Sequence, residues 1–157
     1  MTTFNGLPAH VLLVHFVVVL APLTAFLAIL CAVWAPARKR LVWLVFSLAI
    51  TTVALTPMTT DAGEWLQHQV GRSPQLHAHT ELGDTMIYFA IALAIASALL
   101  VIIHVRQTRG HAVTPAVTAI VAAVVIVAST ATVVQVYRIG DSGARASWGD
   151  QTNQSAN

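Results

Sequence analysis

Apolar residues in this chain are gathered into long runs rather than alternating with polar ones. A helix that crosses a bilayer needs about 20 mainly apolar residues. The chain has four such apolar runs. Three of them approach or exceed that length, and the second run reaches it if its helix continues to Thr60. We therefore predict an all-α fold, an integral membrane four-helix bundle, with spans at about 9–34, 41–60, 85–106 and 113–137.

Composition supports a membrane protein and excludes an ordinary soluble domain. The chain is 57% hydrophobic and 9% charged, whereas soluble domains are about 45–50% apolar and 25% charged. Its eight Lys and Arg against six Asp and Glu are too small an excess to indicate nucleic-acid binding. The single cysteine, Cys31, excludes an internal disulfide and a cysteine-based metal site. We expect one domain over residues 1–149.

Local signals refine the helix boundaries. Ser73-Pro74 resembles a cap followed by a first-turn proline, so the third helix should begin well before its apolar part. Asp61-Ala62-Gly63-Glu64 resembles a capping box, which predicts a separate interfacial segment over 61–72. The last residues, 150–157, are polar, and we expect them to form a disordered tail.

The basic residues predict the orientation in the membrane. Arg38, Lys39 and Arg40 lie between the first two spans, and Arg106 and Arg109 lie between the last two. Because Lys and Arg accumulate in cytoplasmic loops, this end should be cytoplasmic and both termini extracytoplasmic. All six acidic residues then fall on the outer side.

Histidines gather at the same predicted outer end, where three segments contribute five of the seven: His10, His15, His68, His77 and His79. His15 lies roughly 7 Å deeper along its helix than His10. An ionisable group inside the apolar zone is costly unless it faces the bundle interior, so His15 is the better inward-facing candidate. Gly83 follows His79 by one helical turn and should open space beside that imidazole.

Imidazoles on facing helices of a bundle are typical of haem and metal sites. A haem b needs one or two axial imidazoles, an apolar slot and a cationic group near its propionates. His10 or His15, His79 and Arg72 could supply these, which would suit electron transfer. Zinc or copper is the alternative cofactor because imidazole suits both ions. The candidate metal ligands are His10, His15, His79, Asp61, Glu64 and Glu81.

Readings without a cofactor stay open from the sequence. The histidines could be hydrogen-bonded to the acidic residues as polar contacts between helices only. Small-residue faces such as Ala90, Ala94 and Ala98 could pack against a second copy or a respiratory-complex partner, making the chain an accessory subunit. Several imidazoles beside acids are also compatible with pH sensing. Hydrolase, transferase and nucleotide-binding motifs do not occur, so an enzyme is not favoured.

Four stretches carry a resemblance to a known family, and they span nearly all of the chain up to Gly149: 10–16, 56–65, 79–84 and 137–143. With them the chain resembles a bacterial membrane-protein family catalogued as domain of unknown function 2231, particularly its short actinobacterial members. Many relatives have proline after the first histidine and after the His-Phe pair, where this chain has Val11 and Val17.

The resemblance implies a four-helix, multi-pass protein of the bacterial inner membrane without an assigned activity. In some relatives the family's membrane domain looks fused to a Rieske-type iron–sulfur domain, which associates the family with redox reactions. The positions that match the family's motifs are His10, His15, Asp61, Glu64, His79, Glu81 and Gly83.

Overall fold

The computed structural model describes the backbone over residues 3–4, 7–70 and 74–154, and the side chains over residues 12–65 and 76–146. Two short strands, β1 (Thr3–Phe4) and β2 (Leu7–Pro8), pair antiparallel before the first helix. Apart from Trp34, Thr85 and the connection over residues 109–114, the rest of the described chain is helical. The helices are α1 (Ala9–Val33), α2 (Ala35–Val70), α3 (Pro74–Asp84), α4 (Met86–Thr108) and α5 (Pro115–Gln154).

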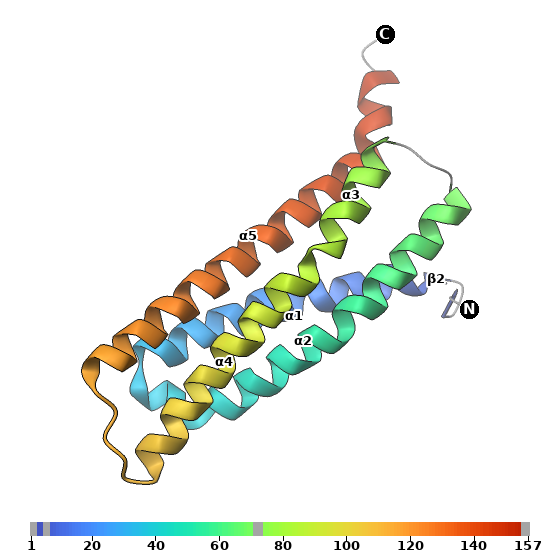
Figure 1. The fold of residues 1–157 in the computed structure, drawn as a ribbon. Helices are drawn as coiled ribbons and strands as arrows, with labels where there is room; N and C mark the ends of the chain where they lie inside the picture. The colour runs from blue at the N-terminus through green and yellow to red at the C-terminus, as the bar shows by residue number, and fades with distance from the viewer. Residues whose placement is uncertain (1–2, 5–6, 71–73, 155–157) are drawn as a thin grey trace.

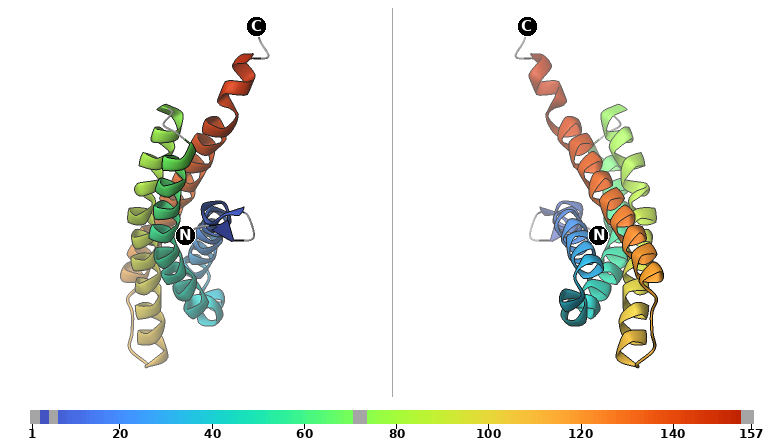
Figure 2. Two further views of the ribbon diagram at one scale, coloured as in Figure 1. Left: turned by 90° about the vertical axis from the view of Figure 1, so that its right-hand side faces the viewer. Right: turned by 90° about the vertical axis from the view of Figure 1, so that its left-hand side faces the viewer.

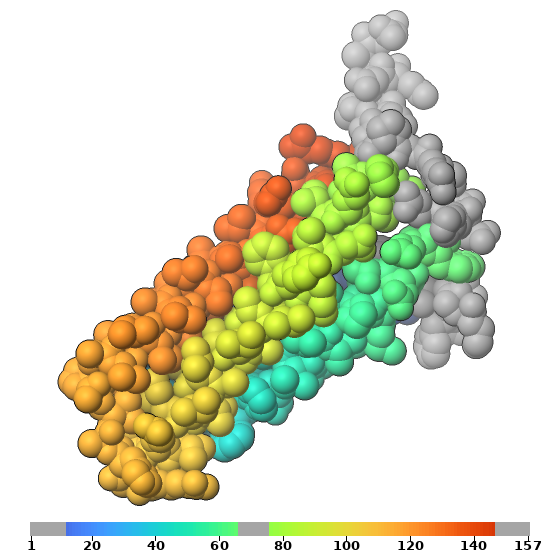
Figure 3. Space-filling model, in the orientation of Figure 1, coloured from blue at the N-terminus to red at the C-terminus, as the bar shows by residue number. Residues whose placement is uncertain are grey.

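The helices form a bundle in which each neighbour runs in the opposite direction (Figure 1). Around the bundle the order is α1, α2, α4 and α5, while α3 continues the line of α4 and packs mainly against α5. Figure 3 shows α2, the α3–α4 pair and α5 side by side on one face. Both termini, the C-terminal end of α2 and the start of α3 lie at one end of the bundle, the terminal end.

Four stretches of the described helices are long and apolar enough to cross a membrane: Leu12–Val33, Ala35–Trp65, Leu76–Thr108 and Pro115–Ala146. The outward surface agrees with this assignment. Phe16, Val19, Phe26, Ile120 and Val127 are each between 63% and 69% exposed, which would be unfavourable in water and is favourable against lipid. The all-α, four-helix membrane architecture predicted from the apolar runs is confirmed.

Small residues form much of the interior. Ala21, Ala25 and Ala28 occupy one face of α1 and are fully buried. Ala25 and Ala28 share a core cluster with larger residues such as Leu93 and Val125, and Ala21 belongs to a second cluster with Met86 and Val136. Without a hydrophobic driving force inside a bilayer, close backbone approach at small residues stabilises helix packing through van der Waals contact.

The third span is a broken helix rather than one continuous segment. It begins at Pro74, as predicted, but α3 ends at Asp84 and α4 begins at Met86. The Thr85 hydroxyl donates to the Leu82 carbonyl (2.7 Å), and Gln135 Nε2 of α5 donates to the same carbonyl (3.2 Å) and to Thr85 Oγ1 (2.7 Å). Side chains that take over backbone hydrogen bonds make such a break tolerable inside a membrane.

Two predicted boundaries differ from the structure. The separate segment expected over 61–72 is instead, as far as residue 70, the last part of α2, which continues without a break past Pro57. The tail expected from residue 150 is helical to Gln154, the end of α5, and Figure 2 shows this helix running beyond the bundle. Polarity alone does not end a helix, and an Arg145–Asp141 ion pair one turn apart (2.9 Å) supports α5 outside the apolar region.

At the opposite end, Arg38 is buried rather than placed in a loop. Only Trp34 separates α1 from α2, so Arg38 lies in the first turns of α2 with 5% of its surface exposed. Its guanidinium donates to the Cys31 carbonyl (3.2 Å) and to Gln107 Oε1 of α4 (3.4 Å). The carbonyls at a helix C-terminus lack intrahelical donors, so Arg38 satisfies one of them and joins three helices.

Candidate functional site

A cavity of about 110 Å³ lies between the helices at the terminal end of the bundle. An apolar cavity of about 150 Å³ can hold benzene, so this one, with about three quarters of that volume, is at the lower limit for a single six-membered ring. Its apolar wall is formed by Val14, Val17, Val18, Leu76, Met86, Val136 and Ile139. Its polar side chains are Thr56, Thr59, Thr60, His79, Thr80 and Asp84. All five helices contribute, although the residues are far apart in sequence.

His79 is the imidazole that the structure places at the cavity. It lies on α3, is half-buried, and has its Nδ1 2.9 Å from the Ser142 hydroxyl of α5. Ser142 donates its own proton to the Ile139 carbonyl (2.8 Å). A hydroxyl has one proton to donate, so in this pair Nδ1 must be the donor. The neutral His79 ring therefore carries its proton on Nδ1 and its lone pair on Nε2.

Two glycines, Gly143 and Gly83, lie close to His79 and leave space around its ring. A Cβ at Gly143 would lie 3.0 Å from His79 Cε1, which is tighter than most real Cβ contacts, so a larger residue there would require the ring to shift by a few tenths of an ångström. At Gly83, which lines the cavity, a Cβ would meet nothing within 4 Å. The space predicted beside His79 is therefore present. Ser142 and Gly143 fall in a stretch that carried the family resemblance, but sequence reasoning did not select them because their role depends on packing between α3 and α5.

Threonines of α2 form a buried row that leads from the cavity into the bundle. Thr52, Thr56 and Thr59 are each at most 8% exposed. Their hydroxyls donate to carbonyls one turn earlier in the same helix, with distances of 2.7–2.8 Å. At the cavity, Thr60 donates to the Pro57 carbonyl (3.0 Å) and Thr80 to the His77 carbonyl (2.9 Å). Buried hydroxyls commonly satisfy themselves in this way on helices.

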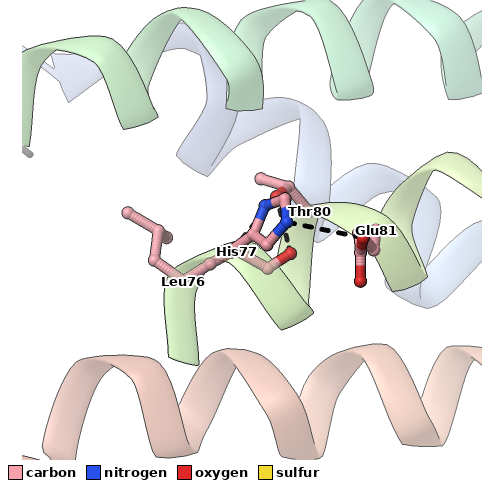
Figure 4. A network of polar contacts seen from close by, with 4 residues as sticks. All are labelled: Leu76, His77, Thr80 and Glu81. Carbon is pink, nitrogen blue, oxygen red and sulfur yellow. Dashed lines mark hydrogen bonds and ion pairs between the residues drawn. The ribbon is translucent and has the colours of Figure 1, made fainter. Parts of the chain in front are cut away.

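The predicted metal ligands whose side chains the structure describes form no metal-binding group. Glu81 pairs with His77, one turn away on α3, at 3.4 Å, with about 70% of each side chain exposed (Figure 4). An exposed pair of this kind contributes little stability. Asp61, Glu64 and His15 are also exposed, so the structure does not bury His15 inside the bundle. Within the described residues, no group of three or more His, Cys, Asp and Glu side chains could hold a metal ion.

His10 lies in the first turn of α1, but its side chain is outside the described part of the chain, as is all of Arg72. Among the described residues the cavity offers one imidazole and room for one ring, not for a haem macrocycle. Haem b, zinc and copper therefore stay predictions from the sequence, and the described geometry does not support them.

Comparison with known proteins assigns a family. A family model described as "Predicted membrane protein (DUF2231)" matches residues 6–156. The chain belongs to this family. The match covers almost the whole of this DUF2231 protein and confirms the resemblance seen in its sequence motifs. Neither the search of curated proteins nor the search of solved structures found a match, so the function of this DUF2231 protein has to be argued from its own residues.

Proposed function

We propose that this protein binds a small, membrane-soluble molecule in the cavity at the terminal end of the bundle. The observation that carries the proposal is a ring-sized cavity, lined by every helix, in which apolar walls surround a few polar side chains. Ligand sites between the helices of bundles commonly have this character, with a mainly apolar lining and a few polar groups that fix orientation.

The position of the cavity supports access from the lipid phase. All of its lining residues fall within the four stretches that are able to span a membrane. A ligand that partitions into the bilayer could therefore reach it without crossing water. The ring of His79 is held by Ser142 and by the close approach of Gly143, and a side chain fixed in this way loses little entropy when a ligand binds.

A pair of glycine variants tests the proposal. Gly83→Leu would place a large side chain in the cavity, whereas Gly140→Leu adds the same group to an exposed position of α5 where a Cβ also meets nothing within 4 Å. We expect protein extracted from its native membrane in polymer nanodiscs to carry a bound small molecule in native mass spectra. The molecule should be retained by Gly140→Leu and lost from Gly83→Leu.

Melting temperatures of both variants check that the fold is intact. Identical small-molecule content in wild type and both variants would overturn the proposal. A Soret band in the purified wild-type protein would favour haem b and electron transfer instead, because it would identify a cofactor that the described residues do not account for.

We also propose an orientation and a location. The end opposite the termini carries Lys39, Arg40, Arg106 and Arg109, and these basic residues favour the cytoplasmic side. The terminal end, with the cavity, then faces away from the cytoplasm. For a bacterial protein this means a multi-pass protein of the cytoplasmic (inner) membrane.

A further inference from the structure

We propose that the cavity selects ligands that donate hydrogen bonds, such as a phenol or hydroquinone ring, over molecules of the same shape that can only accept them. The inference rests on the proposed function and names the chemical class of its ligand. It follows from the acceptor to which each polar side chain at the cavity already donates its proton.

The threonine hydroxyls offer lone pairs rather than protons. A hydroxyl has one proton and two lone pairs. Thr56 donates its proton to the Thr52 carbonyl (2.7 Å), Thr60 to the Pro57 carbonyl (3.0 Å) and Thr80 to the His77 carbonyl (2.9 Å). Each of these oxygens lines the cavity with its donor already used. Toward a ligand they act as acceptors.

The two titratable side chains have the same polarity. The carboxyl oxygens of Asp84 offer lone pairs at the cavity. His79 uses its Nδ1 proton on Ser142, whose own proton goes to the Ile139 carbonyl. Backbone amides inside the flanking helices are engaged with their own carbonyls, so the polar groups that the described residues place at the cavity are predominantly acceptors.

An acceptor-lined site could in principle take a metal cation or a neutral donor. A bound cation needs several anionic or imidazole ligands, and the described residues contain no such group of three. The cavity instead has apolar walls and the volume of one ring. A buried acceptor opposite a ligand atom that is also an acceptor is left unsatisfied, which is unfavourable. A ring with a hydroxyl group packs against the apolar walls and donates a hydrogen bond to one of the acceptors.

A matched pair of probes tests this inference on the full chain in nanodiscs. Phenol and anisole share the same ring, but methylation removes the only donor. Binding to wild type is measured by calorimetry, with the Gly83→Leu protein as the blank for partitioning into lipid. We expect the phenol to bind at least about fivefold more tightly than the anisole, the ratio that one net hydrogen bond supplies.

Two further variants sharpen the result. Thr80→Val removes one acceptor while preserving the shape of the side chain, and should bring the phenol-to-anisole ratio closer to one. Gly140→Leu should leave the ratio unchanged. Equal binding of both probes, abolished by Gly83→Leu, would overturn the donor selectivity and leave the proposed function standing. Binding of neither probe above the Gly83→Leu blank would overturn both.

Discussion

At the scale of single residues, His79 illustrates how a neighbour determines the chemistry of an imidazole. Its neutral form can carry the proton on either nitrogen, and the hydrogen bond made by one nitrogen decides which. Here Ser142 determines the tautomer of His79. Its hydroxyl already donates to the Ile139 carbonyl and can only accept a hydrogen bond from His79. The tautomer is therefore a consequence of packing between α3 and α5.

We predict that nitrogen-15 NMR spectra of histidine-labelled protein at a pH where imidazoles are neutral will show His79 protonated on Nδ1. Ser142→Ala should remove this preference because the acceptor is lost. Ser47→Ala, a change at an exposed serine of α2, should leave the His79 signals unchanged. An Nε2-protonated His79 in the wild-type protein would contradict the assigned tautomer.

At the scale of elements, the break between α3 and α4 depends on a residue from another helix. Gln135 is 3% exposed and reaches both the Leu82 carbonyl and the Thr85 hydroxyl. The Thr85 hydroxyl donates one hydrogen bond to the Leu82 carbonyl, and Gln135 of α5 donates the second. Residues from both sides of the break, Gly83, Asp84 and Met86, line the cavity.

We predict that Gln135→Leu will lower the free energy of unfolding by about 1 kcal/mol, the usual net value of a hydrogen bond. The amides of residues 85–89 should exchange with deuterium faster, because Leu82 and Thr85 lose their partner on α5. Thr130→Leu makes a similar polar-to-leucine change at an exposed position of the same helix and should leave exchange there unaltered. Unchanged exchange in Gln135→Leu would show that the break does not depend on this side chain.

At the scale of the whole molecule, the bundle has two chemically different ends. One end has the buried Arg38, which joins α1, α2 and α4, together with the basic connections. The other has the cavity, the two termini and the acidic residues of α3. This asymmetry is the physical basis of the proposed orientation, since basic residues near spans determine which side stays in the cytoplasm.

We predict that a membrane-impermeant maleimide will label Ala144→Cys in intact cells and will label His111→Cys only after permeabilisation. Both positions are exposed, and they lie near opposite ends of α5. The native Cys31 is buried and should react poorly from either side. The reverse labelling pattern would invert the orientation and place the cavity on the cytoplasmic side.

The sequence alone determined the fold class, the four spans and the early start of the third helix. These follow from local quantities, since the length of an apolar run and a first-turn proline act on the segment that carries them. The open space beside His79 was also predictable, because residues one turn apart on a helix are always neighbours. The same local signals wrongly predicted a break at Asp61 and disorder directly after residue 149: the chain is helical as far as Val70 and Gln154, where the described parts of these two segments end.

Only the tertiary structure decided which polar residues meet. His15, Asp61 and Glu64 are exposed, whereas His79 faces Ser142 across two helices and Gln135 reaches the break at Thr85. Spacing within one helix limits the relative direction of its own side chains but leaves the rotation of that helix against its neighbours undetermined. That rotation is fixed by packing of small and large side chains over the whole bundle, and it determines which imidazole lines the cavity.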